Sequence, residues 1–150
     1  MSDPRNVIVF AVGDARYAFE IRWIREVVTL GFVTTVPSAP PALCGVCNLH
    51  GHIVPVIDVT AIVPGAEPAS GTARQGDGAL LIDVSGSTLA IRLEKIDRVA
   101  SYEYDSGYLL DGASRILLLE PTTVYRVAAE QIALVGNSEE LASGPRAESL

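Results

Sequence analysis

The sequence predicts an all-β fold of the barrel or sandwich class, with short helices. About eight short apolar segments are separated by turn residues every eight to twelve positions. These segments do not alternate with amphipathic helices, as a parallel α/β sheet would require. A chain of 150 residues is long enough for one domain with its own core. We expect that domain to span residues 5–136, and we expect the polar segment 137–150 to be disordered.

The first predicted element is a β-hairpin. Val7–Val12 is a continuous apolar run, Gly13-Asp14 forms the turn, and Arg16–Ile21 alternates apolar and polar side chains. The next apolar segment, Ile24–Val28, fits either one or two turns of helix or a bent strand.

The central stretch runs from Pro37 to Asp58. It follows a predicted strand at Phe32–Val36 and opens with prolines, which cannot continue a central strand. Next comes the turn Asn48–Gly51, in which we expect the first and last residues to supply the positive φ of a tight turn. His52–Ile57 then has the pattern of a strand. A rigid approach and a buried strand therefore present a polar turn, a common way to build a recognition surface.

A second hairpin is predicted after a long loop. Val59–Val63 fits a short helix, and residues 64–78 are rich in Gly, Pro, Ala and Ser, which indicates a mobile loop. Ala79–Val84 and Thr88–Leu93 then form two strands around a Ser-Gly-Ser turn.

The last part of the domain is predicted as loop, strand and helix. Residues 104–114 have the composition of a loop, and Arg115–Glu120 contains a continuous apolar run. Pro121 suits the first turn of a helix that ends near Val135. Because each half of the chain opens with a hairpin, we expect two small sub-barrels that divide near residues 64–78.

Charge and hydropathy exclude several classes of protein. The net charge of −7 and the lack of a basic run argue against nucleic-acid binding. No apolar run reaches the length of a membrane span, and the N-terminus has no secretory signal pattern. We therefore expect a cytoplasmic protein with no direct membrane insertion.

Cys44, Cys47, His50 and His52 form a Cys-x₂-Cys-x₂-His-x-His cluster whose residue types suit zinc. The same cysteines also fit two buried thiols that pack as small hydrophobic groups, or a redox pair. We favour the buried thiols, because zinc knuckles pair their ligands across a longer loop, and we expect no metal and no cofactor. A small metal- or ligand-binding β-barrel protein, or an enzyme, built on this cluster is the alternative function.

No catalytic set stands out in the sequence. His50 and His52 are the only histidines, and Ser38 precedes two prolines without the surroundings of a nucleophile elbow. No two carboxylates are spaced as an acid and base pair. We therefore expect a protein that is not an enzyme.

Four segments carry a family resemblance. Pro37–Asp58, PSAPPALCGVCNLHGHIVPVID, resembles the central signature of CheW-like domains, the coupling modules of bacterial chemotaxis and related signalling arrays. Ile24–Val28, Ile96–Val99 and Ile116–Glu120 are similar to other family segments in the same order. The resemblance covers roughly residues 5–127.

The resemblance implies two packed five-stranded β-barrels with a groove between them. It implies an adaptor that couples chemoreceptors to a CheA-type histidine kinase, in chemotaxis or in a related pathway. The partners would be the regulatory domain of the kinase, packed against the sub-barrel ends, and the cytoplasmic tip of a receptor, held as a helical hairpin in the groove near the turn. Recruitment to membrane-associated receptor arrays would follow.

The resemblance also places six partner-binding residues: Ile24, Glu26, Gly45, Asn48, His50 and Gly51. The usual family form has arginine at the position of His50 and a longer stretch at residues 105–113, so this chain departs at both places. The residues alone leave two points open. Glu26 fits either a solvated edge charge or a groove contact, and Trp23 fits either the core or an interface.

Overall fold

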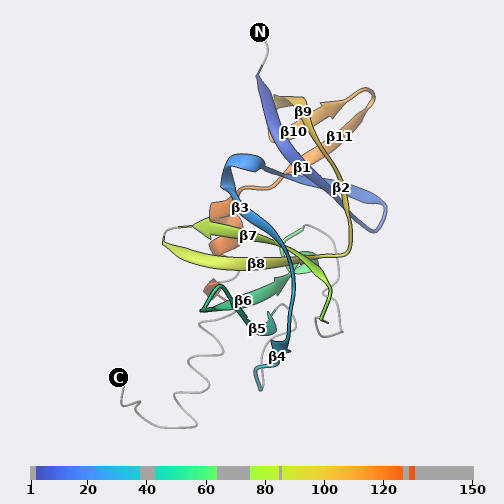
Figure 1. Ribbon diagram of the computed structural model, residues 1–150. Coiled ribbons are helices and arrows are strands. Elements are labelled where there is room, and N and C mark those ends of the chain that lie inside the picture. The colour runs from blue at the N-terminus through green and yellow to red at the C-terminus, as the bar shows by residue number, and fades with distance from the viewer. Residues whose placement is uncertain (1–2, 38–42, 64–74, 85, 127–128, 131–150) are drawn as a thin grey trace.

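The strands form two units, a closed barrel and an open sheet (Figure 1). The computed structural model describes residues 3–37, 43–63, 75–84, 86–126 and 129–130. The barrel contains β1 (Pro4–Val12), β2 (Ala15–Glu20), β11 (Ser114–Leu118), β10 (Tyr108–Asp111) and β9 (Ile96–Asp105), in that spatial order. The sheet contains β3 (Ile24–Thr29), β7 (Gly78–Val84), β8 (Ser87–Leu93), β6 (His52–Asp58), β5 (Leu43–Leu49) and β4 (Val33–Thr34).

The predicted all-β class with two small packed units is confirmed, but the division between the units is not where we expected it. β1 pairs with β2 on one side and with β9 on the other, so the two ends of the domain build one barrel. A short parallel pairing of β11 with β2, at Leu117 with Tyr17 and Leu118 with Ala18, closes it. The second unit is the continuous segment between them and has six strands, not five.

Both predicted hairpins are present, as β1–β2 and β7–β8. The ambiguous segment after the first hairpin forms strand β3, preceded by one 3₁₀ turn, η1 (Ile21–Trp23). The short helix predicted after the central stretch is the 3₁₀ turn η2 (Val59–Ala61). The strand predicted at Phe32–Val36 is limited to the two residues of β4.

The prediction of a loop at residues 104–114 was wrong. β9 continues to Asp105, and β10 follows after a tight turn at Ser106 and Gly107. Both turn residues have positive φ, 53° and 94°, as the central pair of a type I′ hairpin turn requires. Serine is not a strong marker of that conformation, which explains why the composition suggested a loop.

The core consists of three apolar clusters. The largest lies between the barrel and the sheet and includes Phe10 and Phe19, whose rings stack with centroids 5.7 Å apart. The other two fill the barrel and the inner face of the curled sheet. Residues 121–126 and 129–130 are helical, and buried Val124 packs on the largest cluster. Residues 127–128 and 131–135 of the predicted helix, the boundary at residue 136 and the polar segment 137–150 lie outside the described residues.

A buried carboxylate connects two strands of the sheet through its hydrogen bonds. Asp58, 2% exposed, accepts a hydrogen bond from the Thr60 backbone nitrogen at 3.1 Å and caps η2. Its other oxygen accepts a hydrogen bond from Arg92 Nη1 at 2.6 Å, and Arg92 Nε donates a hydrogen bond to Asp77 at 2.8 Å.

In the described part of the chain, no helix is long and apolar enough to cross a membrane.

Candidate partner-binding site

The β5–β6 turn is a two-residue hairpin turn. Leu49 pairs with His52, so His50 and Gly51 are its central residues, with φ of 53° and 82°. Asn48 stays in β5, and its side-chain oxygen accepts a hydrogen bond from the Gly51 nitrogen at 3.1 Å. We had expected Asn48 and Gly51 to have positive φ. The structure confirms Gly51, but the second residue with positive φ is His50 and not Asn48. Histidine is among the few side chains enriched in this conformation.

Glu26 and His50 meet across the open side of the sheet. His50 Nε2 lies 3.0 Å from Glu26 Oε1, although β3 and β5 are not neighbouring strands. Both side chains are exposed, His50 at 61% and Glu26 at 43%. An exposed pair of this kind contributes about 0–1 kcal/mol to stability, so its position on an open surface suits recognition better than folding.

Two of the six predicted site residues lie inside the protein. Ile24 is partly buried and packs on the largest apolar cluster. Gly45 is buried with φ of 148°, and a Cβ there would lie 2.3 Å from the Thr34 carbonyl oxygen. The structure therefore brings Glu26, Asn48, His50 and Gly51 together at the surface, while Ile24 and Gly45 support that surface from below.

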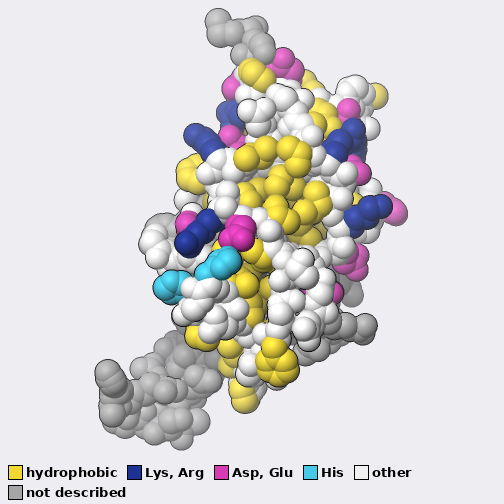
Figure 2. All heavy atoms as spheres, viewed as in Figure 1, with side chains coloured by type: hydrophobic (Ala, Val, Ile, Leu, Met, Phe, Trp, Pro, Cys, Tyr) yellow, Lys and Arg dark blue, Asp and Glu magenta, His cyan; other side chains and the backbone are white. Residues whose placement is uncertain are grey.

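A groove on the barrel runs beside η1. It has a volume of about 590 Å³ and is lined by Arg5, Glu20, Ile21, Arg22 and Val99, among others. Two of these are unusually exposed apolar residues, Ile21 at 38% and Val99 at 62%. Figure 2 shows a band of hydrophobic side chains across this face of the molecule, flanked by charged groups.

Trp23 extends the apolar surface at η1. It is 38% exposed, and the Arg22 guanidinium lies 4.8 Å from its ring centroid. The sequence pattern fits Trp23 to either the core or an interface and does not mark Val99, because a valine in an apolar strand pattern looks the same whether it faces a core or a groove. The only available signal was its place in a segment that resembles the family.

A second apolar surface lies on the outer face of β4, β5 and β6. Phe32, directly before β4, is 78% exposed, and Ile53 on β6 is 67% exposed. Ile53 pairs with Asn48, whereas the adjacent pair, Val54 with Cys47, points inward. Exposed apolar groups on one small face indicate a contact surface.

The Cys-His cluster does not assemble. Cys44 and Cys47 are buried thiols in the core of the sheet, and burial raises the pKa of Cys47. His50 and His52 are exposed at the surface. A bulge between Leu43 and Gly45 turns Cys44 to the same face as Cys47, which explains their shared burial. Across the described residues, no three His, Cys, Asp or Glu side chains are grouped as metal ligands.

Comparisons with known proteins agree with this architecture. A profile of the CheW-like domain matches residues 6–106. A probable chemotaxis protein CheW from Rhizobium etli is 37% identical over 70 residues, which are 47% of this chain and 44% of that protein. The chemotaxis protein CheW of Treponema pallidum is 25% identical over 136 residues, covering 77% of this chain and 78% of that protein. The match thus spans less than half the length of the first relative.

A solved structure has the same fold. The crystal structure of the scaffolding protein TtCheW from Thermoanaerobacter tengcongensis superposes with a TM-score of 0.61 at 19% sequence identity. The superposition covers 79% of this chain and 90% of that one.

Proposed function

Because the chain belongs to the CheW-like domain family, we propose that it is a non-enzymatic signalling adaptor that couples a chemoreceptor to a CheA-type histidine kinase. The pathway is chemotaxis or a related one. Two separate contact surfaces on one small domain, the groove beside η1 and the outer face of β4–β6, carry this proposal. An adaptor needs two such surfaces, because it must hold two partners at once.

The groove beside η1 suits the helical hairpin of a receptor tip. Exposed Ile21, Trp23 and Val99 offer apolar contacts, and Arg5, Glu20 and Arg22 surround them with charge. An amphipathic helix lays its apolar face into a groove of this kind. η1 leads directly into β3, so Glu26 and the β5–β6 turn extend the same contact region.

The outer face of β4–β6 suits the regulatory domain of the kinase. Ile53 is held on strand β6, and Phe32 directly precedes β4, so a rigid partner can pack on this face with little rearrangement of the backbone. Phe32 is the most exposed large apolar residue among those described and the natural anchor.

Calorimetry with each partner tests the proposal. We expect the kinase regulatory domain to bind the full chain in the micromolar range, about −8 kcal/mol. Phe32→Glu should abolish kinase binding and leave receptor binding intact, and Val99→Glu should do the reverse. Leu110→Glu is the matched control, since Leu110 is 42% exposed on the barrel and lies on neither surface. Absence of heat and of co-elution with both partners would refute the adaptor function.

A further inference from the structure

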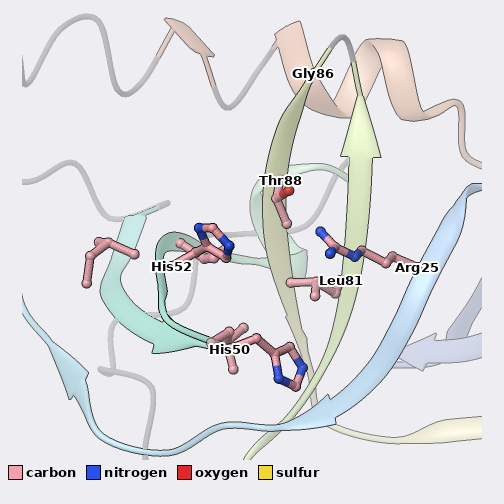
Figure 3. A pocket seen from close by; sticks show the side chains of 9 residues that line it. Arg25, His50, His52, Leu81, Gly86 and Thr88 are labelled. Atoms are coloured by element: carbon pink, nitrogen blue, oxygen red, sulfur yellow. The ribbon is translucent and has the colours of Figure 1, made fainter.

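The curled sheet has an open mouth beside the β5–β6 turn. The opening, about 340 Å³, is lined by the two histidines, Arg25, Thr88 and a set of apolar residues. Figure 3 shows Arg25 and His52 on opposite sides of the opening, with Thr88 and Leu81 between them. Leu81 and Val54 belong to the buried core of the sheet, so the floor is apolar and the rim is polar. Ligand sites commonly form in such a mouth.

The polar groups of the rim are incompletely used. Among the described residues, Arg25 has one ionic contact, 3.6 Å from Nη1 to Asp83 Oδ1, which is longer than a hydrogen bond. Asp83 instead accepts a hydrogen bond from Thr88 Oγ1 at 2.6 Å. His52 makes no hydrogen bond or ion pair with any described residue. A guanidinium and an imidazole therefore face the opening with donors to spare.

Two histidines complete the polar rim. Among the described residues, the charged side chains around the mouth are Arg25 and Glu26 on β3 and Asp83 on β7. His50 on the turn contacts Glu26, which leaves Arg25 and His52 as the rim donors for a bound anion.

We propose that this mouth binds a carboxylate carried on a short aliphatic stem, such as a glutamate side chain. The carboxylate accepts hydrogen bonds from Arg25 and His52, and the stem lies against Leu81 and Val54. The assignment rests on the side chains of the mouth and goes beyond the adaptor function.

Titration of the full chain with sodium glutarate tests the assignment. Glutarate has the carboxylate and stem of glutamate, and glutaramide is its uncharged control. We expect glutarate to shift the ring-proton NMR signals of both histidines and to bind about threefold to tenfold more tightly than glutaramide, the range for one or two exposed charge pairs.

Two variants locate the site. Arg25→Gln and His52→Gln should each weaken glutarate binding. Arg98→Gln is the control, because Arg98 pairs with Asp97 and Asp111 on the barrel. The inference is overturned if glutarate and glutaramide bind alike, or if Arg25→Gln binds as the natural protein does.

Competition identifies the source of the carboxylate. If glutarate displaces a receptor-tip fragment or the kinase regulatory domain, the natural ligand is an acidic side chain of that partner. If glutarate binds more tightly than glutaramide but displaces neither, the mouth binds a free carboxylic acid. The glutarate titration needs no partner, so its failure and the failure of the adaptor function are seen separately.

Discussion

Gly45→Ala should destabilise the protein strongly, through the contact between β5 and β4. The new Cβ would lie 2.3 Å from the Thr34 carbonyl oxygen and 2.9 Å from Val33 Cγ1. The first distance is about 1 Å short of ordinary van der Waals contact, and backbone cannot rotate away as a flexible side chain can. The φ of 148° at Gly45 adds strain for any residue with a Cβ.

The two effects give the size of the loss. Backbone strain of this kind costs about 1–3 kcal/mol, and overpacking costs about 1–3 kcal/mol more. Because β4 is only two residues long, it can move aside, which limits the overpacking cost but exposes partly buried Val33. We expect a loss of about 2–5 kcal/mol in the free energy of unfolding, or a fall in Tm of roughly 4–20 °C.

Urea unfolding followed by circular dichroism measures this loss, with Gly31→Ala as the control. Gly31 has no positive φ, and a Cβ there meets nothing within 4 Å, so its replacement should change stability by less than about 0.5 kcal/mol. Equal stability of the two variants would refute the argument and return Gly45 to the list of direct partner contacts.

Three further predictions concern single side chains. His50→Arg should tighten binding of an acidic receptor-tip fragment by about 0.5–2 kcal/mol in calorimetry, because arginine is always charged and offers more donors; weaker binding would show that the partner is adapted to histidine. Arg92→Ala should lower the free energy of unfolding by about 3 kcal/mol in urea titrations, because it leaves buried Asp58 without its cation, and a loss below 1 kcal/mol would show that water replaces it. Burial raises the pKa of Cys47, so the thiol ionises at a lower pH in the unfolded protein than in the folded one. The free energy of unfolding should therefore be unaffected by Cys47 below about pH 8.5 and should fall as pH rises further. Cys47→Ala should remove that part of the pH dependence in unfolding curves.

The sequence predicted the strands better than it predicted their partners. Alternation in Arg16–Ile21 and the apolar run Val7–Val12 were enough for the first hairpin, because neighbouring strands with a tight turn pair locally. The pairing of β1 with β9 has no local signal, since any apolar strand could fill that place. The division of the chain into halves was wrong for this reason.

The candidate site shows the same limit. The turn residues Asn48 to Gly51 could be predicted because turn chemistry is local. The contact of Glu26 with His50 depends on how two non-adjacent strands curl towards each other, which no spacing in the sequence reveals. The close approach of Gly45 to the β4 backbone could not be predicted, because a glycine needed for close backbone packing and one needed for partner access look identical in sequence.

The interleaved topology sets an order for folding during synthesis. Every strand of the six-stranded sheet lies between residues 24 and 93, so the ribosome releases all of its pairing partners together. β1 is made first, but Val7 must wait for Ala100, about ninety residues later, before the barrel can form. Closing so long a loop is slow relative to local pairing. During most of its synthesis, the nascent chain therefore carries an apolar N-terminal hairpin whose β1 edge has no partner strand, and chaperones can bind that edge in this interval.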